Sequence, residues 1–299
     1  MSALSADEHP PQDLHRQILD WYAAHARELP WRDPSASAWS VMVSEFMLQQ
    51  TPVARVLPIH EAWLERWPTP AGLAAAPSGE AVRAWGRLGY PRRALRLHAA
   101  AQAIVERHQG AVPEAYDALR ALPGVGDYTA AAVAAFAFRQ RHAVLDTNVR
   151  RVFARMLTGV ELPPPSVTRA ERELAASVLP EDPETAATWS VAVMELGALV
   201  CTAARPECPR CPVATRCAWR AAGRPAYDGP VRKVQTWAGT DRQCRGRLLA
   251  VLRESDRPVH RTALEAVWGD VPQRDRALTG LLADGLITQV GPDTFALPG

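Results

Sequence analysis

The sequence predicts a mainly α-helical protein with a small winged-helix-like module at its C-terminal end. Apolar residues recur at spacings of three and four through most of the 299 residues, as in amphipathic helices. The alternating pattern of a β-strand is absent before residue 286. With 47% apolar and 22% charged residues, the chain has the composition of a globular protein of about two domains.

Each predicted helix is bounded by proline, glycine, or a serine or aspartate that can cap it. The predicted helices cover residues 14–25, 39–50, 53–67, 80–88, 94–107, 128–138 and 149–157. Those of the C-terminal module cover 241–254, 261–268 and 273–283, before a β-hairpin that turns at Gly291-Pro292-Asp293. Residues 163–165 are consecutive prolines and 223–230 are rich in turn residues, so both segments are predicted connections.

The charged residues exclude one kind of chemistry. The net charge is +2, and Lys233 is the only lysine among the 34 lysines and arginines. Residues 1–232 therefore hold no side-chain amine that could form a Schiff base. Two arginine clusters, at 92–96 and 150–155, are typical of solvated helix faces and do not by themselves indicate a nucleic-acid partner.

The chain shows no signal for a membrane. Its first residues have neither the cationic start nor the apolar stretch of a signal peptide. The longest apolar run, residues 130–138, is much shorter than the ~18 residues of a membrane span. We therefore expect a cytoplasmic protein.

Four of the five cysteines, Cys201, Cys208, Cys211 and Cys217, lie within 17 residues. A cytoplasmic chain of this size does not need a disulfide framework. Structural zinc sites usually combine two short Cys-x2–4-Cys pairs, and only Cys208 and Cys211 form such a pair. The uneven spacing in a tight loop favours a [4Fe–4S] cluster over zinc. Arg205, between the first two cysteines, is then placed to contact a phosphate.

The turn Leu122-Pro-Gly-Val-Gly126 joins two helical stretches. Gly124 and Gly126 carry no Cβ, so backbone N–H groups can approach a ligand closely. The start of the following helix adds a partial positive charge, which makes the turn a candidate phosphate site. A single Gly-x-Gly turn is also typical of a plain helix–helix connection, so its meaning depends on the other motifs.

Two carboxylates stand in different surroundings. Glu45 lies in the apolar segment Val41–Leu48, where burial favours the protonated acid; pairing with a core arginine is the alternative. Asp146 lies just before the helix predicted from Val149, where it can act as N-cap and is expected to stay ionised. A neutral acid and an anion are the pair of groups that cleaves a glycosidic bond.

Together these motifs resemble the helix-hairpin-helix DNA glycosylases with an iron–sulfur loop, and among them the A/G-specific adenine glycosylases of the MutY type. The resemblance covers about residues 14–222. The matching segments are Leu29-Pro-Trp-Arg32, Ser44–Thr51, Leu88-Gly-Tyr90, Leu122–Gly126, Leu145–Val149, Met194–Ala198 and the cysteine loop.

The resemblance implies a two-lobed, all-α fold. A helical lobe with the hairpin would span about residues 29–135, and an iron–sulfur lobe would combine 1–28 with 136–222. A linker at 223–232 would lead to the winged-helix-like module at 233–299. The family usually continues into a Nudix-like domain that reads 8-oxoguanine, and the pattern after Arg232 does not match one.

The resemblance also implies a base-excision repair enzyme that acts as a monomer in the bacterial nucleoid. Its substrate would be double-stranded DNA with adenine mispaired with 8-oxoguanine or guanine, and the adenine would be flipped out of the stack. Glu45 would protonate adenine and later help to activate water, while Asp146 would stabilise the cationic sugar. Asn148 would orient the acid or the water. Tyr128 stands where related lyases carry their Schiff-base lysine, so no strand cleavage is expected.

Further residues are assigned by the resemblance to the adenine pocket and to DNA. The pocket would be lined by Leu29, Trp31, Arg32 and Leu48, although core packing is the alternative and is favoured for Leu48. The DNA contacts would come from Gln49, Gln50, Thr51, Tyr90, Pro123, Gly124, Val125, Gly126 and Arg205. Tyr90 would wedge beside the orphaned base. Val191 departs from the family, which has Glu or Gln there, so one hydrogen bond to adenine would be missing.

Three other functions compete with this interpretation. An endonuclease III-like lyase would need an amine near the hairpin, which Tyr128 does not supply. A thymine-mismatch glycosylase remains open, although Gln49-Gln50-Thr51 and the pocket residues favour adenine. A non-enzymatic iron–sulfur DNA-binding regulator would have no use for Glu45, Asp146 and Asn148 in this arrangement.

Overall fold

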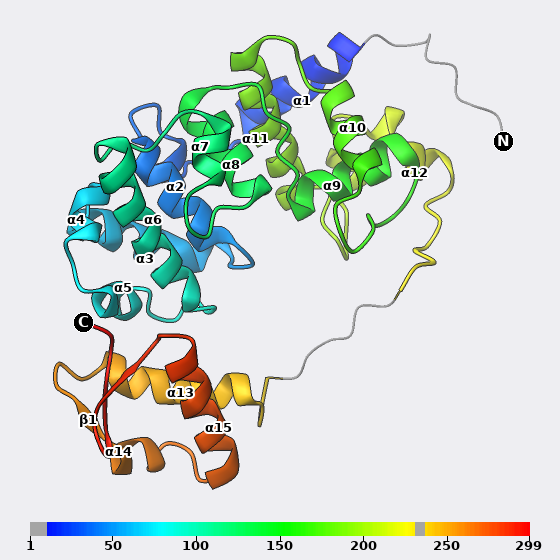
Figure 1. Cartoon of the computed structure of the whole chain (residues 1–299). Helices are drawn as coiled ribbons and strands as arrows, with labels where there is room; N and C mark the ends of the chain where they lie inside the picture. The colour runs from blue at the N-terminus through cyan, green and yellow to red at the C-terminus, as the bar shows by residue number, and fades with distance from the viewer. Residues whose placement is uncertain (1–10, 231–236) are drawn as a thin grey trace. The chain divides into compact units, whose positions relative to one another are not determined.

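Helices make up nearly all the regular structure in residues 11–230 and 237–299, which this computed structural model describes (Figure 1). Lys233 lies outside the described residues. The elements before the linker are α1 (Pro11–His25), η1 (Pro30–Arg32), α2 (Ala38–Leu48), α3 (Val53–Arg66), α4 (Pro70–Ala74), α5 (Ser78–Ala84), α6 (Arg92–His108), α7 (Tyr116–Arg120), α8 (Asp127–Phe138), α9 (Thr147–Phe153), η2 (Ala154–Thr158), α10 (Arg169–Ser177), α11 (Pro183–Leu199), η3 (Cys208–Arg210), η4 (Ala214–Arg216) and α12 (Ala218–Ala221). None of the described helices is long and apolar enough to cross a lipid bilayer.

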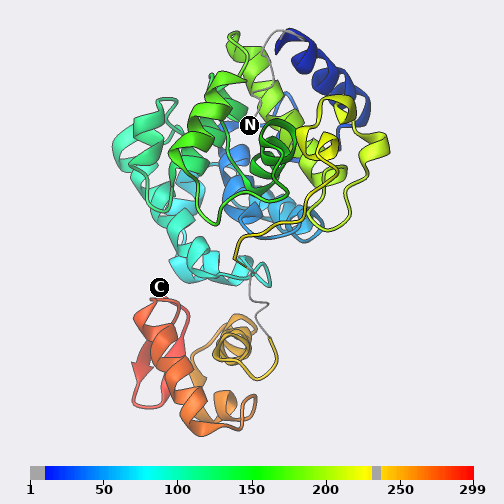
Figure 2. The same ribbon diagram turned by 90° about the vertical axis from the view of Figure 1, so that its right-hand side faces the viewer.

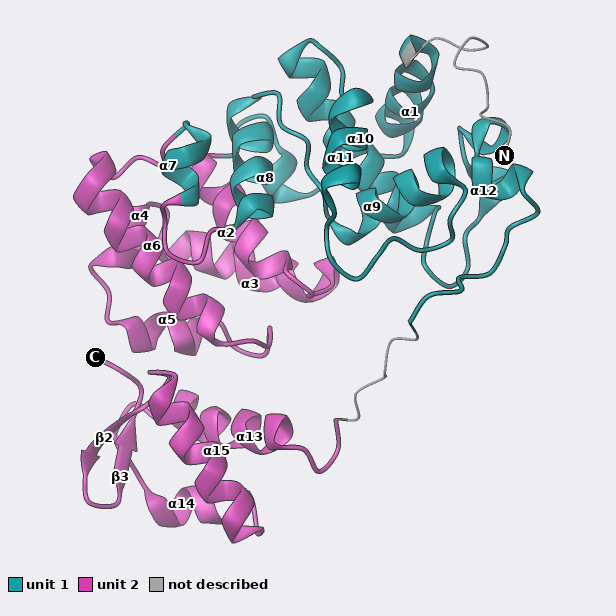
Figure 3. Ribbon diagram, turned by 45° about the vertical axis from the view of Figure 1, so that its right-hand side comes forward, with its two compact units in different colours: residues 1–36, 114–120, 126–231 teal, residues 37–113, 121–125, 232–299 magenta. Residues whose placement is uncertain are grey.

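The chain divides into two compact units (Figure 3). The first unit comprises residues 1–36, 114–120 and 126–231, and the second comprises 37–113, 121–125 and 232–299. This division differs from the expected lobe boundary near residue 135. It places α8 in the first unit, where α8 packs against α7 and α11. It also groups the C-terminal module with the second unit.

The core of the first unit forms around α11, against which α1 and α9 pack. Asp182 caps this helix, since its Oδ2 accepts the backbone N–H of Thr185 at 2.8 Å, and Pro183 occupies the first turn. Trp189 and Leu196 are fully buried on the face that meets α1 and α9. The α9 helix continues into η2, a single π-helical turn, where an unbroken α-helix to residue 157 was expected.

In the second unit, α4 and α5 pack on α6, and α2 packs on α3. Trp63 lies edge-to-face with Trp67 and Trp85, with ring centroids 4.7 and 5.8 Å apart. The α5 helix ends at Ala84 rather than near residue 88, because Gly86 adopts a left-handed conformation with φ of 52°.

The C-terminal module has the expected winged-helix arrangement of three helices and a hairpin. Its elements are α13 (Asp241–Arg253), β1 (Val259–His260), α14 (Arg261–Glu265), α15 (Val271–Ala283), β2 (Thr288–Gly291) and β3 (Thr294–Ala296). The antiparallel order is β1-β3-β2, with Val259 opposite the buried Phe295. Figure 2 shows α13 nearly end-on, beside α15. The two-residue β1 was too short to be predicted from alternation.

Gly124 and Gly126 provide a matched pair for a first prediction. Gly124 has φ of 78°, and a Cβ there would lie 2.7 Å from Cβ of Arg96. Gly126 has φ of −99°, and a Cβ there would meet open space. We expect Gly124→Ala to lower the free energy of unfolding by about 1–3 kcal/mol and Gly126→Ala to leave it nearly unchanged. Thermal and denaturant unfolding check this; equal stabilities of the two variants would contradict it.

Candidate active site

Glu45 is a buried acid within an apolar helix, as its neighbours predict. Ser37 caps α2 by accepting the N–H of Ser40 at 3.1 Å, and most of the helix that follows is buried. Glu45 is the only charged residue of α2 and is 4% exposed. It belongs to the second unit.

A buried arginine closes the C-terminal end of this helix. Arg93 of α6 donates from Nη1 to the carbonyl oxygens of Phe46, Met47 and Gln49 at 2.9, 3.1 and 2.6 Å. Its side chain therefore satisfies carbonyl groups left unpaired at the end of α2. Burial lowers the pKa of Arg93 to about 10. The expectation that this arginine cluster lies on a solvated face is wrong for Arg93, because the sequence does not show which carbonyls the fold brings to it.

The same guanidinium fixes two turns that carry predicted DNA contacts. Its Nη2 donates to Thr51 Oγ1 and to the carbonyl oxygen of Gly89, both at 3.1 Å. Gln50 and Tyr90, next to these acceptors, adopt left-handed conformations with φ of 55° and 47°. Such conformations are unfavourable outside glycine and persist where surrounding contacts impose them. Tyr90 remains 50% exposed.

Asp146 caps α9 in the first unit, as predicted. Its Oδ1 accepts the backbone N–H of Val149 at 2.6 Å, and its Oδ2 accepts Nδ2 of Asn148 at 2.8 Å. Both hydrogen bonds favour the ionised form, as expected at the start of a helix. Burial raises the pKa of Asp146 above its usual value, although the hydrogen bonds from Val149 and Asn148 act to lower it.

Arg151 connects this pair to the cysteine loop. It donates to Asn148 Oδ1 at 2.8 Å, to the carbonyl oxygen of Gly197 at 2.7 Å and to that of Cys201 at 2.7 Å. Gly197 allows α11 to approach, since a Cβ there would lie 2.7 Å from Cβ of Asn148. Sequence reasoning gave Arg151 no such role, because its acceptors at Gly197 and Cys201 lie 46 and 50 residues away in the chain.

A second buried carboxylate is fully compensated by arginines. Glu195 of α11 accepts Nε and Nη2 of Arg27, both at 2.7 Å, and Nη2 of Arg32 at 2.8 Å. Burial acts to raise its pKa, but these hydrogen bonds lower the pKa of Glu195 to about 2. Arg32, predicted to line the adenine pocket, is thus held in a buried ion pair, and Leu29 and Trp31 are each 7% exposed beside it in the chain.

The remaining predicted contacts are distributed as follows. Leu48 and Tyr128 are partly buried, and Tyr128 packs against the core of α8. In the hairpin turn, Val125 is buried, whereas Gly124 and Gly126 are exposed. Arg205 is exposed in the loop between the first two cysteines.

The four loop cysteines are free and partly buried. Burial raises the pKa of the Cys211 thiol to about 11, and the charges of Cys201, Cys217 and Cys208 add to the increase. Across the described part of the chain, histidine, cysteine, aspartate and glutamate form no group of three or more that could hold a single metal ion. The charge contributions of the other three cysteines indicate that they lie near Cys211.

Arg155 supports the first of these cysteines. It is 1% exposed and donates from Nη1 to Cys201 Sγ at 3.4 Å and to the carbonyl oxygen of Thr202 at 2.7 Å. Its guanidinium also stacks 4.6 Å from the ring centroid of Trp219 in α12. A fixed cation beside a sulfur stabilises the thiolate form that metals bind.

Comparison with known proteins identifies the family. Residues 43–177 match the family described as HhH-GPD superfamily base excision DNA repair protein. The chain is 55% identical to an adenine DNA glycosylase of Mycobacterium tuberculosis over 94% of this chain and 92% of that protein. The chain belongs to the adenine DNA glycosylase family. It is therefore a base-excision repair glycosylase.

Two further comparisons define the breadth of this similarity. The chain is 33% identical to a thymine-DNA glycosylase of Aeropyrum pernix over 68% of this chain and 92% of that protein. A structure of endonuclease III in a non-covalent complex with DNA superposes with a TM-score of 0.60 at 21% identity, over 73% of this chain and all of that chain. The latter confirms the helix-hairpin-helix fold.

Asp146→Asn separates stability from activity. Because burial raises the pKa of Asp146, the folded state binds this proton more tightly than the unfolded state. The stability that the group contributes is greatest below its unfolded pKa of ~3.9 and is lost as pH rises through the folded pKa. Asparagine can also act as N-cap and carries no charge. We expect Asp146→Asn to melt at or above the wild-type temperature at pH 7.5 while losing base release.

Activity should show the opposite dependence on pH. If the carboxylate is the working form, base release by the wild type declines as pH falls through the raised pKa of Asp146. Single-turnover rates at several pH values, with circular dichroism to monitor folding, measure this. A variant that melts far below the wild type, or that releases the base at the wild-type rate, would contradict the assignment.

Proposed function

We propose that this glycosylase removes adenine mispaired with 8-oxoguanine or guanine from double-stranded DNA and leaves the strand intact. The main structural support is the hydrogen bond between Asp146 and Asn148 at 2.8 Å, with Asn148 held by Arg151. The chain is also 55% identical to an adenine DNA glycosylase. Buried Glu45 supplies the second carboxyl group.

In the proposed reaction, Glu45 donates its proton to N7 of the flipped adenine. The glycosidic bond then breaks, its electron pair leaves with the base, and positive charge develops on the sugar. The Asp146 carboxylate stabilises this cation, and the Asn148 amide holds the carboxylate in place. The Glu45 carboxylate finally accepts a proton from water as the water oxygen bonds to the sugar.

The absence of strand cleavage rests on Tyr128. A lyase forms a Schiff base through an amine, and Tyr128 at the start of α8 carries a phenol instead. The single lysine, Lys233, falls outside the described residues. Water is therefore the proposed nucleophile.

Cys201, Cys208, Cys211 and Cys217 would hold a [4Fe–4S] cluster. The four thiols are free, and the charges of the other three help to raise the pKa of Cys211, so a positive metal centre that replaces the thiol protons would be stabilised there. When bound, the cluster supplies a structural cross-link for the loop. Arg155 would hold Cys201, and Arg205 would face DNA from the loop.

The proposed partner is duplex DNA, bound by a monomer in the cytoplasm. Gly126 offers exposed backbone at the start of α8, where the helix dipole favours a phosphate. Gln49, Gln50, Thr51 and Tyr90 would contact the site of the flipped base. Leu29, Trp31, Arg32 and Leu48 would surround the adenine.

A duplex assay tests the substrate. Full-length protein is incubated with adenine opposite 8-oxoguanine, guanine or thymine, and with thymine opposite guanine, each with and without alkali. We expect adenine release from both purine mispairs and strand breaks only after alkali. Thymine release, for which the 33% identity to a thymine-DNA glycosylase provides a reason, or strand breaks without alkali, would refute the proposal.

Glu45→Gln tests the acid directly. The amide keeps the size of the side chain but has no proton to donate, so we expect single-turnover base release to fall by at least 100-fold. Affinity for the mispaired duplex should stay within about threefold of wild type, since binding rests mainly on phosphate contacts. Wild-type-like turnover would remove Glu45 from the mechanism.

A further inference from the structure

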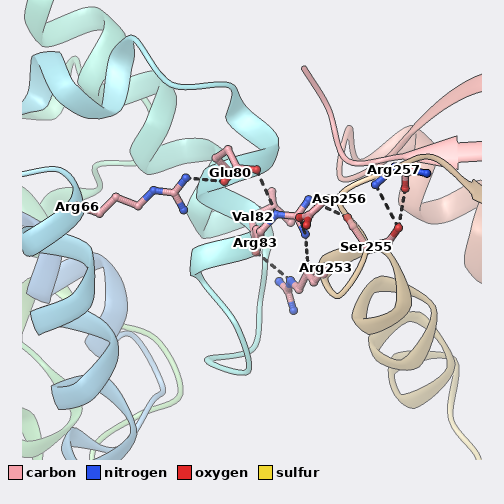
Figure 4. A network of polar contacts seen from close by, with 8 residues as sticks. All are labelled: Arg66, Glu80, Val82, Arg83, Arg253, Ser255, Asp256 and Arg257. Atoms are coloured by element: carbon pink, nitrogen blue, oxygen red, sulfur yellow. Dashed lines mark hydrogen bonds and ion pairs between the residues drawn. The ribbon is translucent and has the colours of Figure 1, made fainter.

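The C-terminal module is fixed to α5 by a reciprocal pair of arginines (Figure 4). Arg83 of α5 donates to the carbonyl oxygens of Arg253 and of Ser255, the latter at 2.9 Å, at the C-terminal end of α13. Arg253 donates to the carbonyl oxygens of Val82 and Gly86 at 2.9 and 2.6 Å, at the C-terminal end of α5. Each arginine therefore places positive charge at the negative end of the other's helix.

Neighbouring charges orient the side chain of Arg83, and burial partly desolvates that of Arg253. Glu80 binds Arg83 Nε at 3.1 Å and Arg66 Nη2 at 2.6 Å, which orients Arg83 toward α13 (Figure 4). Burial lowers the pKa of Arg253 to about 10. A partly desolvated guanidinium with two carbonyl partners indicates a defined docking contact rather than a loose tether.

Two more contacts hold the module in the same position. The N–H of Gly79 donates to the carbonyl oxygen of Pro298 at 2.8 Å, and a Cβ on Gly79 would lie 2.3 Å from that oxygen. Asp284 pairs with Arg92 of α6 at 3.3 Å and also with Arg245 of α13. The tail, α13 and the residue after α15 are thus all attached to the α5–α6 region of the second unit.

This docking places the N-terminal end of α13 beside Tyr90. The Arg242 guanidinium lies 5.9 Å from the Tyr90 ring centroid, and that of buried Arg93 lies 5.4 Å from it. With 13 residues, α13 is about 20 Å long, so it reaches from α5 to the exposed tyrosine.

The charge at this point is positive. Arg242 and Arg87 are exposed around Tyr90, whereas the exposed Arg92 is paired with Asp284 at 3.3 Å. The adjacent Asp241 is directed to α15, since it accepts Gln273 Nε2 at 2.9 Å and pairs with Arg276 at 3.6 Å. A cation beside an exposed aromatic ring is the combination that binds nucleic-acid backbones next to a stacked base.

We propose that the C-terminal module is part of the DNA-binding surface and that Arg242 binds a backbone phosphate beside the nucleotide contacted by Tyr90. The proposal rests on the assignment of Tyr90 to DNA in the proposed function. It gives the module a role in affinity, through α13, that the catalytic residues do not supply.

The test compares Arg242→Ala with Arg257→Ala. Arg257 is an exposed arginine just beyond the other end of α13, so both variants lose one surface charge from the same module. Fluorescence anisotropy with an undamaged 30-base-pair duplex, at several salt concentrations, gives the affinity and its salt dependence. Arg242→Lys is the third variant, because a lysine retains a point charge for phosphate.

We expect Arg242→Ala to bind about tenfold more weakly at 0.1 M salt and to reduce the slope of log affinity against log salt by about 1. Arg242→Lys should recover most of the affinity, and Arg257→Ala should match the wild type. Wild-type affinity and slope in Arg242→Ala, or an equal loss in Arg257→Ala, would overturn the proposal.

A separate readout distinguishes this proposal from the proposed function. Adenine release is measured with the same preparations under single-turnover conditions at saturating enzyme, where weaker binding is masked. If the wild type releases no adenine, the proposed function fails, while the duplex-binding comparison still decides the role of Arg242. Normal adenine release together with unchanged DNA binding by Arg242→Ala refutes only the proposal that Arg242 of the C-terminal module binds DNA.

Discussion

The hydrogen bonding of buried guanidinium groups to backbone carbonyls is the interaction on which the described site depends. Arg93 closes α2 and holds two left-handed turns, while Arg151 and Arg155 hold the end of α11 and the segment after it. Each of these sets of contacts needs several N–H donors held in one plane, as in a guanidinium group. The ammonium group of lysine does not have this geometry. The near absence of lysine, compositional in origin or not, is therefore compatible with a structure in which cations act mainly as multidentate caps.

Local patterns allowed much of the fold and part of the site to be predicted. The cap at Asp146, the burial of Glu45 and the C-terminal hairpin depend on neighbouring residues, and the structure shows all three. The contacts of Arg93 could not be predicted, because its acceptors at Phe46–Gln49 lie 44 or more residues away. The end of α5 at Ala84 also depended on a left-handed glycine that spacing alone does not reveal.

Two buried carboxylates of the first unit show how their hydrogen-bond partners determine the direction of the pKa shift. Glu195 has two arginine partners and a pKa of about 2, whereas Asp146, bonded by an amide and a backbone N–H, has a raised pKa. Sequence position suggested the ionised form for Asp146, but the balance is set by tertiary burial. Perturbed pKa values of this kind are common at functional sites.

The reciprocal arginines between α5 and α13 also constrain how this protein can change by recombination. Arg83 and Arg253 each find their acceptors in the helix that carries the other. A chimera that exchanges only residues after the linker would leave Arg83 facing a foreign helix end and the carbonyls of α5 without their cap. Arg83 and Arg253 lie 170 residues apart in the chain, and the segments that carry them must therefore be exchanged together.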